Sequence, residues 1–181
     1  SGRGRTPRVL VRATPADDRG LQITGQPTLE ALEFEVDASL SASDRFSVEE
    51  GIVIREILTL NDSGTFASTL VLDGGTLEIT DQPTLSGILR QQDGSKIKLG
   101  QSAILTTEQA VDLGSSVLSL EGPGTLTNAE AFVLAQDSGL DLSQGVVVTG
   151  DIEMGGGVFR SSGNAEVSGA LSISAETSVQ I

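Results

Sequence analysis

The chain has no histidine, no cysteine, no tryptophan and no tyrosine among its 181 residues. Without histidine and cysteine, the usual nucleophilic triads and the zinc sites built from imidazole or thiolate ligands are excluded. Because there is no cysteine, disulfides do not stabilise the fold, and the sequence is compatible with both oxidising and reducing compartments. Phenylalanine, at five residues, is the aromatic type present, which favours a narrow core of Leu, Ile and Val.

Long apolar runs are also missing. No uninterrupted apolar stretch approaches the roughly 18 to 20 residues that span a bilayer, no signal peptide opens the chain, and no phosphate-binding glycine loop precedes a helix pattern. We therefore expect no direct membrane insertion. Because the chain opens at Ser1 without Met, we expect a processed or excised part of a protein, from which an export signal and neighbouring domains have been removed.

Basic residues are scarce over most of the chain. Residues 1–19 hold five Arg against two Asp, a net charge of +3, so the other 162 residues carry six basic against 23 acidic groups, a net of −17 within the total of −14. Such a surface repels nucleic-acid phosphates and anionic lipids, so nucleic acid is not an expected partner. It attracts cations and basic protein surfaces.

Short alternating runs separated by glycine-containing turns fill the rest of the chain, most clearly between Leu118 and Val148. Alternation points successive side chains to opposite faces of a strand, and glycine supplies the sharp bends between strands. An apolar-x-apolar triplet followed by a short turn recurs at residues 70–72, 97–99, 111–113, 140–142, 152–154 and 171–173. The repeating unit is therefore a short strand, a tight turn and another short strand.

An internal repeat sets the length of that unit. Residues 21–29, LQITGQPTL, return as residues 77–85, LEITDQPTL, with seven of nine residues identical at an offset of 56. A weaker repeat relates residues 58–66 to 118–126 at an offset of 60. Divided by three, these offsets give coils of roughly 19 to 20 residues, as in single solenoid repeats. The sequence predicts an all-β fold, a parallel β-solenoid over residues 20–181.

Two segments depart from this pattern. In SASDRFSVEEG, Ser43 is a candidate helix cap and Glu49 and Glu50 follow it, which predicts a short irregular or helical insertion near residues 41–51. Residues 1–19 are predicted to form a basic arm that is either flexible or docking. The strand-like run in this arm could pair with an exposed sheet edge, with Val9 and Val11 on one side and Arg8, Leu10 and Arg12 on the other.

The last run, Ser178–Ile181, alternates without a polar cap, so a final coil there would expose unpaired amides and carbonyls. We expect either that the protein continues past Ile181 or that this edge meets another subunit. Val179 and Ile181 are therefore candidate assembly residues, together with the strand-like run of the arm.

Carboxylates are the remaining candidates for chemistry. Asp137, Asp141, Asp151 and Glu153 fall near predicted corners, where stacking would gather them into an acidic ladder. Calcium takes such oxygen ligands, but the glycine-rich calcium repeat does not occur, because the run at residues 155–160 lacks its aspartate. Catalytic carboxylate pairs also need side chains that grip a sugar. The prediction is a solvated acidic face without catalysis and without a cofactor, with calcium as the weaker alternative.

Residues 118–128, LSLEGPGTLTN, and 70–79, LVLDGGTLEI, show a Leu-x-Leu strand, a glycine-rich corner and a Gly-Thr-Leu strand. In this the chain resembles, over residues 58–181, the right-handed parallel β-helix passengers of bacterial autotransporters and filamentous-haemagglutinin-type adhesins. The resemblance implies a rigid, export-competent rod of bacterial or phage origin, extracellular or at a cell surface. The resemblance includes no catalytic motif that could be assigned to residues of this chain.

Three functions are compatible with these features. The first is a non-catalytic structural or adhesive module, a rod or display scaffold whose partners are neighbouring domains or subunits, a cell-surface receptor or a glycan. The second is a self-assembling filament or phage-type fibre subunit, joined head to tail through the basic arm. The third is a β-helix polysaccharide lyase or hydrolase, against which the lack of Tyr, Trp and a basic cluster counts.

Overall fold

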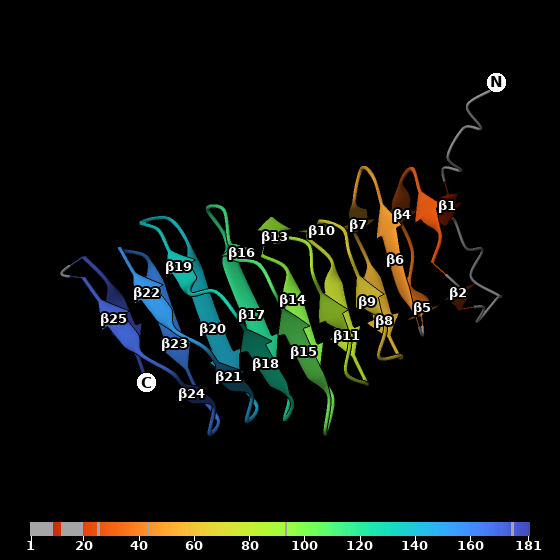
Figure 1. Cartoon of the computed structure of the whole chain (residues 1–181). Coiled ribbons are helices and arrows are strands. Elements are labelled where there is room, and N and C mark those ends of the chain that lie inside the picture. The colour runs from red at the N-terminus through yellow and green to blue at the C-terminus, as the bar shows by residue number, and fades with distance from the viewer. Residues whose placement is uncertain (1–8, 12–19, 25, 43, 93, 175) are drawn as a thin grey trace.

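The computed structural model describes residues 9–11, 20–24, 26–42, 44–92, 94–174 and 176–181. Over these residues the chain is all-β, without a helix, and forms a parallel β-solenoid of about eight coils of roughly 20 residues each. The coils stack one after another along a single axis, with the first described strands at one end of the stack and the last ones at the other (Figure 1). The predicted fold class is confirmed.

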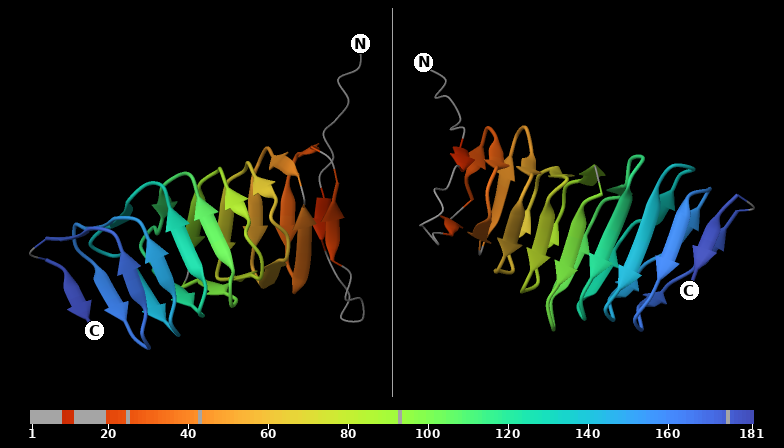
Figure 2. Two further views of the ribbon diagram at one scale, coloured as in Figure 1. Left: turned by 60° about the horizontal axis from the view of Figure 1, so that its bottom comes forward. Right: turned by 180° about the vertical axis from the view of Figure 1, so that it is seen from behind.

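Three faces of parallel strands run the length of the stack (Figure 2). The first face comprises β1 (Val9–Val11), β4 (Leu32–Phe34), β7 (Ile52–Ile54), β10 (Leu70–Asp73), β13 (Leu89–Gln92) and β16 (Val111–Asp112), followed by a second sheet of β19 (Phe132–Leu134), β22 (Ile152–Met154) and β25 (Leu171–Ile173). The second face comprises β2 (Leu21–Ile23), β5 (Ala38–Ala42), β8 (Ile57–Leu60), β11 (Thr76–Ile79), β14 (Lys96–Leu99), β17 (Val117–Glu121), β20 (Gly139–Ser143), β23 (Val158–Ser161) and β26 (Ser178–Gln180). The third face comprises β3 (Thr28–Leu29), β6 (Arg45–Val48), β9 (Thr65–Phe66), β12 (Thr84–Leu85), β15 (Ile104–Thr107), β18 (Thr125–Asn128), β21 (Val147–Thr149) and β24 (Glu166–Ser168).

The internal repeat falls on equivalent strands three coils apart. Its first copy forms β2 and β3, and its second copy forms β11 and β12, with β5 and β8 between β2 and β11 in the sheet. The weaker repeat relates β8 and β9 to β17 and β18 in the same way. The division of both offsets by three is therefore confirmed.

The core is a column of aliphatic side chains between the three faces. In most of the described strands the alternating residue points inward, as in β10, where Leu70 and Leu72 are buried and Val71 and Asp73 are not. All five phenylalanines are buried, and the rings of Phe46 and Phe66, paired in register, meet edge to face at 5.0 Å. Such close packing of aliphatic and aromatic groups is the main source of stability in the array.

Several buried polar side chains are hydrogen-bonded across coils. Gln91 Nε2 donates to the Leu113 carbonyl at 3.0 Å, and Ser95 Oγ donates to the Leu72 carbonyl at 2.9 Å. Thr107 Oγ1 donates to Asn128 Oδ1, so Asn128 is paired with a threonine of the preceding coil rather than with another asparagine. These bonds remove the cost of burying unpaired polar atoms.

The insertion predicted near residues 41–51 is wrong. Residues Arg45–Val48 form β6, a regular strand of the third face, in which Phe46 and Val48 are buried. Glu49 and Glu50 lie in the bend that follows, where their amides donate to the Leu29 and Glu30 carbonyls. Phe46 and Val48 alternate with polar residues, and as a strand this segment buries both side chains in the common core. This burial outweighs the local preference for a helix start.

Candidate functional site

The four carboxylates proposed as an acidic ladder do not stack on one another. Asp141 lies in β20 on the second face, with Ser119 and Arg160 as its register partners. Glu153 lies in β22 on the first face, between Val133 and Ser172. The predicted ladder is not formed, because Asp141 and Glu153 lie on different faces and have neutral or basic register neighbours.

The other two carboxylates lie in the connections between strands. Asp137 lies in the turn before β20. Asp151 lies just before β22, where its Oδ1 accepts a hydrogen bond from the Ala170 amide at 2.8 Å. Across the described part of the chain, no three Asp or Glu residues gather in a group that could hold a metal ion.

Part of the proposed docking strand pairs within its own chain. Val9–Val11 forms β1 and runs parallel to β4 at the edge of the first face, with Val9 opposite Leu32 and Val11 opposite Phe34. Arg8 and Arg12 lie outside the described residues. The strand prediction for this run is confirmed, and its partner is the first complete coil of the same chain.

The two candidate assembly residues at the other end lie in or beside the last coil. Val179 in β26 is 37% exposed and pairs with Phe159, while Ile181 is fully exposed. Their role in assembly stays a prediction.

Charged side chains line the outward rows of the second face. Glu78, Lys98 and Glu121 are register neighbours on β11, β14 and β17. Lys98 Nζ donates to Glu78 Oε1 at 3.1 Å, and Lys96 Nζ, two residues earlier on the same strand, donates to Glu121 Oε1 at 3.1 Å. Two lysines are thus paired with two glutamates across three successive coils, which leaves this patch close to neutral on an acidic body.

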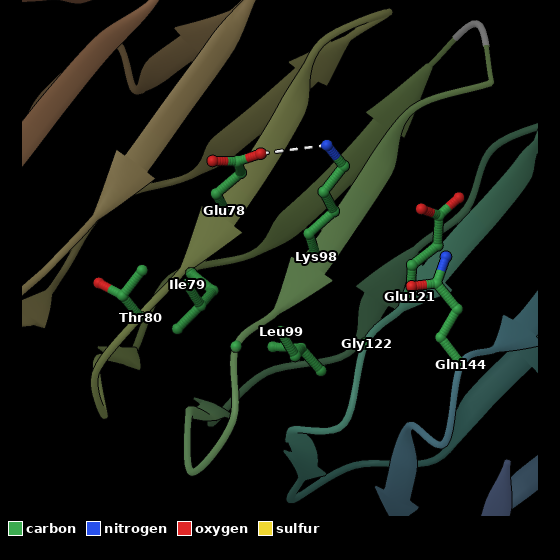
Figure 3. Close-up of a pocket in the computed structure, with 9 residues that line it drawn as sticks. Glu78, Ile79, Thr80, Lys98, Leu99, Glu121, Gly122 and Gln144 are labelled. Atoms are coloured by element: carbon green, nitrogen blue, oxygen red, sulfur yellow. Dashed lines mark hydrogen bonds and ion pairs between the residues drawn. The ribbon is translucent and has the colours of Figure 1, made fainter. Parts of the chain in front are cut away.

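A surface hollow of about 440 Å³ lies beside these pairs, where the strands of the second face end (Figure 3). The Glu78–Lys98 pair borders it on one side, and Glu121 and Gln144 lie on the other. Other lining residues include Ile79, Thr80, Leu99, Gly100 and Gly122. Glutamate oxygens and the Thr80 hydroxyl accept hydrogen bonds, while Lys98 and Gln144 donate them. The rim of the hollow therefore carries both hydrogen-bond donors and hydrogen-bond acceptors.

Glycine keeps this corner open. Gly122 has φ +103°, and a Cβ built on it would lie 2.2 Å from the Leu99 carbonyl oxygen. A side chain there would therefore strain the backbone and collide with the coil below. This site was not predicted from the sequence, although Lys96 and Lys98, the two lysines of the chain, were a visible signal in a body with few cations.

No helix in the described residues is long and apolar enough to cross a membrane. No family model, curated protein or solved structure matches the chain.

Proposed function

We propose that this chain is a non-catalytic structural module, a stiff β-solenoid that spaces or displays a binding surface outside a cell. The observation that supports this most directly is the continuity of the strand ladders. Nine parallel strands on the second face and eight on the third follow one another without a break in pairing order. At 4.7–4.9 Å per strand, the nine strands span about 40 Å.

The stiffness comes from the ladders and the core rather than from surface charge. Arg55 bridges coils through Glu33 at 3.7 Å and Asp73 at 3.1 Å, and Arg90 pairs with Asp112 at 2.8 Å. Because these side chains are substantially exposed, each pair contributes at most about 1 kcal/mol, and salt screens it. The packing of buried aliphatic side chains and the backbone hydrogen bonds are not weakened by salt screening in this way.

The extracellular location and the adhesive role rest on the likeness in pattern to surface β-helix proteins. Glycans or surface receptors are the partners that such a scaffold would meet, and the hollow beside Glu78 and Lys98 is one place for a polar ligand.

Light scattering combined with small-angle X-ray scattering, at low and at high salt, tests this proposal. We expect an 18.6 kDa particle whose scattering curve fits the stacked coils and does not change with salt. A polymer that forms at low salt and dissolves at high salt would contradict the monomeric scaffold.

The filament hypothesis is the second candidate, and the position of β1 bears on it. One side of β1 is already paired with β4 of its own chain, so docking of this strand onto a neighbouring subunit would have to use its other side. This favours the monomeric rod over head-to-tail joining through the arm.

A further inference from the structure

A row of five threonines runs along the third face, one on each of five consecutive strands. Register pairing places Thr65 beside Thr84, Thr84 beside Thr106, Thr106 beside Thr127, and Thr127 beside Thr149. Each is half-buried and points outward, since the residue next to it in the strand is a buried core residue: Phe66, Leu85, Leu105, Leu126 or Val148. We call this row, from β9 to β21 in Figure 1, the threonine face.

A second row accompanies it on three of these strands. Ile104, Thr125 and Val147 pair in register two residues before the threonines. They are also half-buried. The two rows together present methyl groups at every position and hydroxyl groups at most of them.

The five strands of the threonine face carry no outward charge, whereas Arg45 on β6 and Glu166 on β24 border the face in register. Among the described residues of the five strands, no outward position of the threonine face carries a charge. The same five coils place Asp73, Arg90 and Asp112 outward on the first face, and Glu78, Lys96, Lys98, Glu121 and Asp141 outward on the second. All three faces are parallel sheets with the same preference for β-branched residues, so that preference alone does not explain the difference.

The backbone fixes the spacing of the row. Neighbouring strands lie 4.7–4.9 Å apart, and residues two apart in a strand are separated by about 6.6 Å. The threonine face is therefore a regular lattice about 19 Å long. Two buried rows support it from below. One row comprises Phe66, Leu85, Thr107 and Asn128, and the other comprises Leu105, Leu126 and Val148. Close packing of these rows with the core holds the lattice rigid.

The area and composition of the face limit what can bind it. At roughly 130 Å², it is far smaller than the roughly 800 Å² that each partner contributes to a stable protein interface, so a second copy of the chain is not its occupant. A soluble sugar chain is gripped by aromatic platforms and charged clefts, whereas this face is an uncharged lattice and the chain has no Tyr or Trp.

A flat, rigid and regular surface of methyl and hydroxyl groups matches a partner that is itself flat and regular. We propose that the threonine face binds the surface of ice. Methyl groups spaced by the strand repeat order the water between them, and the hydroxyls hydrogen-bond to that ordered layer, which then merges with the lattice. Charged side chains would orient water around themselves and break this order, which accounts for their exclusion. The inference rests on the proposed rigid scaffold and names the surface that it would adhere to.

The test measures ice growth in the presence of the purified chain, by the shape of single ice crystals and by the inhibition of recrystallisation. The disruptive variant is Thr106→Tyr, at the centre of the row. Its matched control is Thr59→Tyr, because Thr59 is also a half-buried, outward-facing third residue of a four-residue strand, but on the second face. Tyrosine is favoured in exposed strands, so both variants are expected to fold.

We expect the chain and Thr59→Tyr to facet ice crystals, and Thr106→Tyr to need about tenfold more protein for the same inhibition, as when one central contact is lost. Unchanged ice growth, or an equal effect of the two variants, would overturn the inference. So would retention on insoluble cellulose or chitin that Thr106→Tyr abolishes, since the face would then serve a polysaccharide. Circular dichroism and X-ray scattering on the same samples separate the proposals: a folded monomer without an effect on ice removes only the ice inference.

Discussion

Single residues decide how tightly the coils turn. Gly122 and Gly74 both have positive φ, at +103° and +73°, but their surroundings differ. A Cβ on Gly122 would lie 2.2 Å from the Leu99 carbonyl oxygen, whereas a Cβ on Gly74 would meet nothing within 4 Å. The first glycine is required by conformation and by contact with the coil below, and the second by conformation alone.

Replacing Gly122 by alanine is expected to lower the free energy of unfolding by about 3 kcal/mol or more, because strain and a steric clash add together. Gly74→Ala is the matched control, with an expected loss of about 1–2 kcal/mol from the left-handed conformation alone. Urea unfolding followed by circular dichroism measures both. Equal losses for the two variants would mean that the corner at Gly122 relaxes without cost.

At the scale of elements, the strand β6 shows where local signals mislead. Ser43, Glu49 and Glu50 resemble the start of a helix, yet the alternation of Phe46 and Val48 places residues 45–48 in the third face. A helix-cap residue stabilises only one turn of helix. The alternating pattern instead places two side chains in a core that every coil shares. The same alternation is why the strands at residues 70–72, 97–99, 140–142 and 152–154 could be predicted directly.

Ser47→Pro tests this strand. The Ser47 amide donates to the Pro27 carbonyl at 3.2 Å, and proline removes that donor, so we expect a loss of about 3 kcal/mol in the free energy of unfolding. Ser47→Thr keeps the amide and adds a β-branched side chain next to Thr28, so it should be neutral within about 0.5 kcal/mol. If chemical denaturation shows that proline is tolerated as well as threonine, residues 45–48 do not act as a strand.

At the scale of the whole molecule, net charge and free strand edges have opposite effects on self-association. The body carries a net charge of −17, which keeps copies apart in dilute salt. β1 covers the edge of β4 and becomes the edge strand of the first face, so the outer row of backbone amides and carbonyls at this end belongs to β1.

Deletion of residues 1–19 is expected to change self-association little, because β4 replaces β1 as the edge strand of the first face. Association through that edge should be strongest at high salt, where repulsion between the acidic bodies is screened. Sedimentation velocity at several concentrations measures it. The double variant Arg8→Gln with Arg12→Gln keeps the sequence of β1 and lowers the basic charge, so it should stay monomeric. A wild-type chain that polymerises and a truncated chain that does not would support the filament hypothesis instead.

The sequence by itself determined the coil length, most strands and the core, because alternation and glycine corners are local features and the repeat copies at residues 21–29 and 77–85 show their period directly. It did not determine which residues stand beside one another. The five threonines are separated by 19, 22, 21 and 22 residues, and Lys96 is 25 residues from its partner Glu121. Only the tertiary structure decided which side chains form these rows. Packing of the core sets the register of each coil, and loops of unequal length accommodate the different numbers of residues per coil.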